Sequence, residues 1–177
     1  MQMLGFIQKK GQGDGDRTLA SVAVTLSSRG FVLAGVIQIN YVFDPERRCH
    51  MDLQVLGDGP TVRISQDRGR FAQGCRLDPE GLAHAVALVD ATLERGEVDL
   101  LIVNKFGKAE LEGGGFREVI GKALIAGVPA LTTVSPAHLS EILGYAGELG
   151  AKLHADHDEV VAWCLAQRET AMNAGAE

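Results

Sequence analysis

A glycine-rich loop near the start of the chain has the residue types and the spacing of a phosphate-binding site. Residues 11–18 read Gly-Gln-Gly-Asp-Gly-Asp-Arg-Thr and lie between an apolar run and a helical pattern. A strand that leads through glycines into a helix can bind an anion, because the loop N–H groups and the positive end of the helix converge on one point. Gly11 and Thr18 fit the phosphate-loop spacing of Gly, four residues, Gly-Lys-Ser/Thr. Asp16 and Arg17 replace its second glycine and its lysine, so the charge chemistry of the loop has changed.

We predict that this loop binds a small anionic ligand. The backbone N–H groups of Gly11, Gly13 and Gly15 are the expected donors. The guanidinium of Arg17, whose fork can pair with a phosphate, and the hydroxyl of Thr18 complete the set. The alternative is an ordinary strand-to-helix connection that needs flexible glycines.

A second group of polar residues follows an apolar strand in the middle of the chain. Residues 99–103 are almost wholly apolar, and residues 104–108 read Asn-Lys-Phe-Gly-Lys. Ligands of open α/β sheets lie at the carboxyl ends of the strands, so this turn should lie near the glycine loop. Lys105 and Lys108, with Arg17, would then form a pocket for a small oxyanion without a metal ion. The alternative is a pair of solvated surface lysines.

Arginine is concentrated between residues 47 and 76, which hold six arginines and three acidic residues. Arg63 and Arg76 are the members of this patch that we expect to contact an anionic ligand; a solvated basic face is the alternative. The whole chain has a net charge of −6, which argues against binding to nucleic acid or to an anionic membrane.

Cysteine and histidine residues offer a separate hypothesis, a metal site. Cys49 and Cys75 are soft ligands that could pair across neighbouring segments, although buried or incidental thiols are the alternative. His154 and His157 have a spacing found in metal sites, but the acidic residues around them are equally typical of a helix start. Cys164 lies in an apolar helical pattern and is expected in the core.

Apolar periodicity and turn residues predict alternating strands and helices. One helix is expected between an Asp16 N-cap and a Gly30 stop, and another between Asp78 and Gly96. The other expected helices are 116–126, 135 to about 149, and 158–172. After the first apolar run, the expected strands are 31–39, 53–56, 61–65, 99–103, 128–134 and 151–154.

This alternation predicts an α/β protein with a mostly parallel sheet. The 177 residues suit a single domain, 1–177. The turn Gly57-Asp58-Gly59-Pro60 predicts a β-hairpin insertion at about 49–66. The sequence shows neither a signal peptide nor an apolar run long enough for a membrane span, so we expect a cytoplasmic protein.

Two segments resemble a known group of enzymes. The run 99–112, Asp-Leu-Leu-Ile-Val-Asn-Lys-Phe-Gly-Lys-Ala-Glu-Leu-Glu, and the later Gly115-Phe116-Arg117 resemble the second signature of the cancer-related and thermophilic-archaeal nucleoside triphosphatases. A nearer likeness is to an uncharacterised bacterial family of such proteins, whose genes are often found beside molybdenum-transport genes. The runs that carry it are Cys49-His50-Met51-Asp52, Arg63-Ile64-Ser65-Gln66, Gly74-Cys75-Arg76-Leu77-Asp78 and Val103-Asn104-Lys105-Phe106-Gly107-Lys108.

The resemblance implies a three-layer P-loop NTPase-like fold, but this sequence departs from the active enzymes at chemically important positions. Phosphoryl transfer needs a lysine on the phosphates, a hydroxyl on magnesium and a carboxylate at the end of the second strand. Asn104 and Lys105 stand where the related enzymes have Asp-Glu. We expect Asn104 among the ligand-binding residues, where it can offer magnesium a neutral oxygen but little charge. Glu110 is the residue that would supply a catalytic carboxylate from the next turn.

We therefore predict a degenerate P-loop protein that binds a nucleotide or a small oxyanion, with a role in molybdenum handling. Nucleotide with magnesium, or molybdate, is the expected ligand. One alternative is a slow nucleoside triphosphatase that uses Arg17, Thr18 and Glu110. Another is a protein-interaction module with a vestigial loop, which binds a protein partner or a second copy of the chain.

Overall fold

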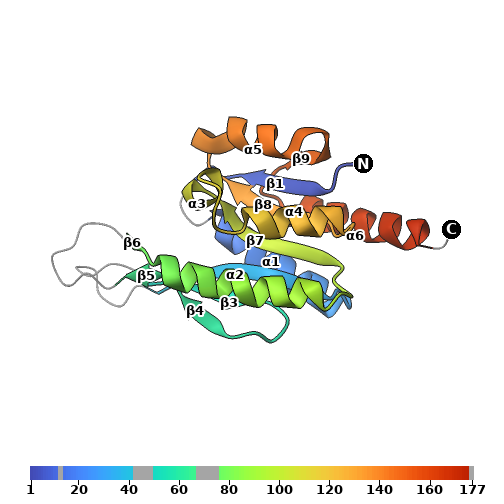
Figure 1. The fold of residues 1–177 in the computed structure, drawn as a ribbon. Helices are drawn as coiled ribbons and strands as arrows, with labels where there is room; N and C mark the ends of the chain where they lie inside the picture. Colours follow the sequence, from blue (N-terminus) through green and yellow to red (C-terminus); the bar gives the residue numbers. More distant parts are fainter. Residues whose placement is uncertain (12–13, 42–49, 67–75, 176–177) are drawn as a thin grey trace.

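The computed structural model describes residues 1–11, 14–41, 50–66 and 76–175 (Figure 1). A seven-stranded sheet runs through the molecule in the order β4-β3-β2-β7-β8-β1-β9. Its strands are β1 (Leu4–Gln8), β2 (Leu33–Tyr41), β3 (His50–Val55), β4 (Thr61–Arg63), β7 (Leu100–Phe106), β8 (Ala130–Val134) and β9 (Gly150–Leu153). Along the sheet from β2 through β7, β8 and β1 to β9, all neighbouring strands are parallel. β3 and β4 are antiparallel additions at the β2 edge. The mostly parallel sheet predicted from the sequence is confirmed.

Helices cover both faces of this sheet (Figure 1). One face carries α1 (Asp14–Ser28) and α6 (His157–Ala174). The other face carries α2 (Pro79–Glu94), α4 (Arg117–Ile125) and α5 (Leu139–Ala146), the last flanked by the 3-10 turns η1 (Pro136–His138) and η2 (Gly147–Leu149). The short helix α3 (Lys108–Leu111) follows β7, and β5 (Ser65–Gln66) pairs with β6 (Arg76–Leu77).

The central strand β7 shows why the fold has three layers. Leu100 and Ile102 are buried in the cluster that contains α1 and α6, whereas Leu101 and Val103 are buried in the cluster that contains α2 and α4. Successive side chains of a strand point to opposite faces, so an unbroken apolar strand requires a helix layer on each side. The expected three-layer α/β architecture is therefore present.

The predicted hairpin is also present. β3 and β4 pair in antiparallel register, and the backbone N–H of Val55 donates to the carbonyl of Pro60 at 3.0 Å. Gly57 and Asp58 adopt positive φ angles of 75° and 60° in the turn. Glycine adopts this conformation without strain, and aspartate is one of the few other residues that tolerate it.

Two boundaries differ from the sequence prediction in ways that matter for function. α1 already begins at Asp14, so Asp16 lies within its first turn and not at the N-cap. β7 continues through Phe106, so Asn104 and Lys105 belong to the strand and not to the turn after it. The Asp78 N-cap, by contrast, is confirmed, because its side chain accepts the N–H of Glu80. Among the described residues, no helix is both long enough and apolar enough to cross a membrane.

Candidate anion-binding site

The first turn of α1 packs directly against the end of β8. Gly15 is buried at this contact, and a Cβ atom there would lie 2.8 Å from Cγ2 of Thr133 and 3.3 Å from Cε of Lys9. A side chain at residue 15 would therefore push the helix away from the strand. The close approach brings the unpaired N–H groups of the helix N-terminus to the carboxyl edge of the sheet, where the partial positive charge of the helix also lies.

Asn104 connects three neighbouring elements at this edge. Its Oδ1 accepts the backbone N–H of Gln38 on β2 at 2.8 Å, and its Nδ2 donates to Oδ1 of Asp16 on α1 at 2.8 Å. The hydroxyl of Thr133 on β8 donates to the Asn104 carbonyl at 2.6 Å. Asn104 is only 3% exposed. Both polar atoms of its side chain are therefore engaged inside the protein.

Lys9 is a candidate site residue that the loop spacing did not indicate. It directly follows β1, and its backbone N–H donates to the Val134 carbonyl at 2.9 Å. Its side chain is half-buried, and this burial lowers the pKa of Lys9; the Asp16 carboxylate opposes the shift and the Lys105 ammonium adds to it. These charges therefore act on one another across one corner of the sheet. We call Lys9, Asp16, Asn104 and Lys105 the Lys9–Lys105 corner.

The residues that the phosphate-loop spacing selected have other partners than the residues of the Lys9–Lys105 corner. Arg17 has a side chain that is 77% exposed, and it pairs with Asp14 at 2.8 Å on the outer surface of α1. The Thr18 hydroxyl donates to the Asp14 carbonyl at 3.0 Å, a bond inside the helix. Gly11 is exposed, and Gly13 lies outside the described residues. Because the helix begins early, Arg17 and Thr18 stand a turn into it.

Glu110 is buried, with 4% of its surface exposed, and both carboxylate oxygens accept backbone hydrogen bonds. Gly107 N–H donates to Oε2 at 2.9 Å, and Phe116 N–H donates to Oε1 at 3.1 Å. Gly115 passes close by with a φ of 54°, and a Cβ on it would lie 2.2 Å from Oε1. The carboxylate of Glu110 thus holds together the loop between β7 and α4.

Lys105 and Lys108 are both exposed to solvent near the end of β7. Lys105 belongs to the corner through its effect on Lys9. Lys108 has a side chain that is 84% exposed and lies 3.9 Å from Glu112, one helical turn away. An ion pair this exposed is worth little, so the ammonium of Lys108 stays available to a ligand.

The structure gives less support to the arginine patch as a ligand site and to the metal hypothesis. Arg63 lies on the edge strand β4 and pairs with the buried carboxylate of Asp52. At the usual strand spacing, β4 lies roughly 24 Å from β1 and roughly 14 Å from β7, so Arg63 lies apart from Lys9. Cys49, Cys75 and the side chain of Arg76 lie outside the described part of the chain. Within that part, no three His, Cys, Asp or Glu residues are grouped to hold a metal ion.

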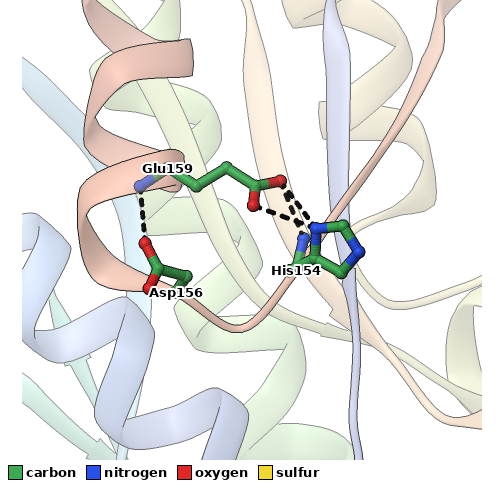
Figure 2. Close-up of polar contacts among 3 residues, drawn as sticks. All are labelled: His154, Asp156 and Glu159. Carbon is green, nitrogen blue, oxygen red and sulfur yellow. Dashed lines mark hydrogen bonds and ion pairs between the residues drawn. The ribbon is translucent and has the colours of Figure 1, made fainter.

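The histidines near the C-terminus organise the start of α6. Figure 2 shows Glu159 facing His154, which approaches one carboxylate oxygen with Nδ1 at 2.9 Å, while Asp156 accepts the Glu159 N–H at 2.9 Å as N-cap. The hydrogen bonds from the backbone and ring of His154 lower the pKa of Glu159. His157 instead reaches Thr25 on α1, with Nε2 and Oγ1 2.9 Å apart. The two imidazoles have different partners, which favours the helix-start interpretation over a shared metal ion.

Three comparisons place the chain among known proteins. Residues 4–163 match the family described as "Protein of unknown function (DUF2478)". Over 154 residues the chain is 32% identical to the molybdenum import ATP-binding protein ModC 2 of Bradyrhizobium diazoefficiens. That alignment covers 86% of this chain but only 17% of the relative, so the chain corresponds to a minor part of it.

The third comparison concerns the fold. The crystal structure of THEP1 from the hyperthermophile Aquifex aeolicus superposes with a TM-score of 0.64 over 96% of this chain and 99% of that one, at 14% sequence identity. At this identity the likeness shows the fold alone, and it confirms the P-loop NTPase-like α/β fold that the sequence predicted.

Proposed function

The chain belongs to the DUF2478 family of proteins of unknown function, and we propose that it binds a small anionic ligand at the Lys9–Lys105 corner. The observation that carries this proposal is the half-buried ammonium of Lys9, which lies beside the first turn of α1 and within electrostatic reach of Lys105. Two ammonium groups and the N–H groups of a helix N-terminus form a natural receptor for phosphate-like anions.

Fixed positive charge, in this proposal, replaces magnesium at the corner. Magnesium prefers oxygen ligands in octahedral geometry. Asn104 has its oxygen occupied by Gln38, and the hydroxyl of Thr18 is bonded within α1. The ammonium groups of Lys9 and Lys105 would also repel a divalent cation at this corner, so we assign no catalytic step to a metal ion.

The carboxylate of Asp16 is compatible with anion binding because of its partner. One oxygen accepts a hydrogen bond from the side-chain amide of Asn104, and this bond directs part of the negative charge of the carboxylate toward β7. Lys9 and Lys105 together outnumber this single carboxylate, so the corner keeps a net positive charge.

Two ligand classes follow from the comparisons. The P-loop NTPase-like fold favours a nucleotide whose phosphates occupy the corner. The likeness to a molybdenum import ATP-binding protein favours either a nucleotide or molybdate. Both present tetrahedral oxyanion groups, which Lys9 and Lys105 would bind by charge-assisted hydrogen bonds.

Slow triphosphatase activity is the less favoured function. It requires a carboxylate that can position water, and Glu110 instead accepts two backbone N–H groups in a buried loop. We therefore assign Glu110 a role in holding this loop and expect little phosphate release from ATP or GTP with magnesium.

A thermal-shift series tests the proposal. ATP, ADP, molybdate, tungstate, phosphate and sulfate are added singly to the full chain, and at least one is expected to raise the melting temperature. Lys9→Met should remove that shift, because it deletes the charge and shortens the unbranched side chain by only one atom. Lys152→Met on the exposed side of β9 is the matched control and should retain it. A series without any shift, or a shift that survives Lys9→Met, contradicts the proposal.

A further inference from the structure

A cavity of about 270 Å³ lies on the face of the sheet opposite α1, between β2, β3, β7 and the helices α2 and α3. Most of its lining is aliphatic or aromatic. The apolar side chains that define it are Val36, Leu53, Ile64, Leu82, Val103 and Phe116. Apolar side chains in a protein interior normally pack without such space, so the cavity calls for a functional explanation.

The cavity reaches solvent at a basic edge. Lys105 and Lys108 both line it, and both are exposed. Glu110 also lines it, but its two oxygens already accept the N–H groups of Gly107 and Phe116. Asn104 lines it with a side chain that is already engaged by Gln38 and Asp16, and Gln38 contributes a neutral amide. The charged groups that remain to meet a ligand at this edge are therefore cationic.

Size and chemistry together define the ligand. Small-molecule pockets usually measure roughly 300–1,000 Å³ and combine an apolar lining with a few polar groups that orient the ligand. A volume just below that range suits one ring system. The apolar part of the lining favours an aromatic ring, because binding removes the ring surface from water. Met51 also lines the space, and its flexible thioether adapts well to a flat ring.

We propose that this cavity binds the hydrophobic ring of a small organic anion, whose phosphate or carboxylate group contacts Lys105 and Lys108. This site lies on the other side of the sheet from Lys9, and it shares Asn104 and Lys105 with the Lys9–Lys105 corner. The proposal rests on the cavity residues and holds whether or not an inorganic anion binds beside α1. It makes this cavity selective for anions that carry a ring.

Phenyl phosphate, inorganic phosphate and benzyl alcohol separate the contributions of ring and charge. Titration calorimetry should show phenyl phosphate binding about tenfold or more tightly than inorganic phosphate, because the ring is removed from water. Benzyl alcohol should compete with it for the cavity. Equal affinity for phenyl phosphate and inorganic phosphate would overturn the proposal.

Variants then locate the ring. Leu82→Trp fills the cavity and should reduce phenyl phosphate to the affinity of inorganic phosphate, whereas Leu143→Trp on the exposed surface of α5 should change neither. Lys108→Met changes an exposed residue and should weaken the binding of phenyl phosphate about threefold to tenfold. This second variant keeps the proposal testable if Leu82→Trp does not fold. Unchanged affinity in Lys108→Met, or in a folded Leu82→Trp, contradicts the proposal.

The variant Lys9→Met distinguishes a failure of this inference from a failure of the proposed function. If the proposed function and this inference both hold, the variant loses its affinity for inorganic phosphate but keeps its affinity for phenyl phosphate within about threefold. If the corner does not bind anions, phenyl phosphate still binds and still responds to Leu82→Trp. If the cavity is not a ring site, phenyl phosphate follows inorganic phosphate in every variant.

Discussion

The side-chain amide of Asn104 donates a 2.8 Å hydrogen bond to the carboxylate of Asp16 and so joins the end of β7 to the first turn of α1. These two residues lie 88 positions apart in the chain. Asp16 departs from the phosphate-loop pattern by adding a carboxylate, and Asn104 stands where the triphosphatases that the sequence resembles have one. The structure shows that the two departures form a donor and acceptor pair.

Exchanging this pair tests its importance. Asn104→Asp removes the donor and sets two carboxylates against each other in a buried position, and we expect it to lower the free energy of unfolding by about 2 kcal/mol. The double variant with Asp16→Asn restores one donor and one acceptor. Urea denaturation should show that it recovers at least half of the loss. If the two single effects simply add, the pair is not coupled as described.

Glu110→Gln is expected to affect stability and not hydrolysis. An amide cannot accept two N–H groups as a carboxylate does, and its NH₂ group would face a donor, so unfolding should become easier by about 2 kcal/mol. Glu112→Gln is the matched control two residues away, and its exposed pair with Lys108 should contribute little. Robust phosphate release from ATP that Glu110→Gln abolishes would instead identify Glu110 as catalytic.

The lowered pKa of Lys9 predicts a pH dependence. Burial favours the neutral amine, so the ammonium form is lost at lower pH than in an exposed lysine. Sulfate binding should therefore weaken as the pH rises toward the ordinary lysine pKa of about 10.4, before an exposed lysine loses its proton. Sulfate keeps its charge over this range, so the change reports on the protein. Calorimetry that shows constant affinity up to about pH 10 contradicts this prediction.

The same shift has an opposite effect on stability. Because the folded pKa lies below the unfolded one, the unfolded chain binds more protons in the interval between them, and stability rises with pH there. Lys9→Met should lack this rise. Urea midpoints measured across the same pH range for both proteins provide the comparison, and parallel curves would show that Lys9 does not titrate as described.

Cys164 should be chemically inert in the native protein. It is buried against α1, and this burial raises the pKa of its thiol to about 12. The thiolate is the reactive form, so iodoacetamide at about pH 8 should label Cys164 only after unfolding. Intact-mass and peptide analysis will detect the modification, and rapid native labelling of Cys164 would argue against its place in the core.

Much of the fold could be predicted because its signals are local. The apolar strand at 99–103 indicated burial on two faces, and Asp78 with Pro79 indicated the start of α2. The same reasoning placed Asn104 and Lys105 at the edge of the sheet that receives α1. These predictions all rest on hydrophobic periodicity and helix capping, which can be recognised without knowledge of distant contacts.

The site was harder to predict because it depends on helical phase. A template for the loop selected Arg17 as the cation, but α1 begins at Asp14 and turns Arg17 outward. Lys9 takes the inner position instead. Its place directly after β1 was the available signal, since strand ends bear ligands in such sheets. The partnership of Asn104 with Asp16 could not be inferred, because no local pattern joins residues so far apart.

Titration calorimetry of the full chain with ADP, and separately with molybdate, tests the central claim most directly. The claim is that fixed positive charge at the Lys9–Lys105 corner binds an anion without magnesium. At least one of the two should bind without magnesium, about 5 mM magnesium should alter its affinity less than threefold, and Lys9→Met should weaken it about tenfold or more. Binding that requires magnesium and is indifferent to Lys9→Met, or the absence of binding by either ligand, would contradict the claim.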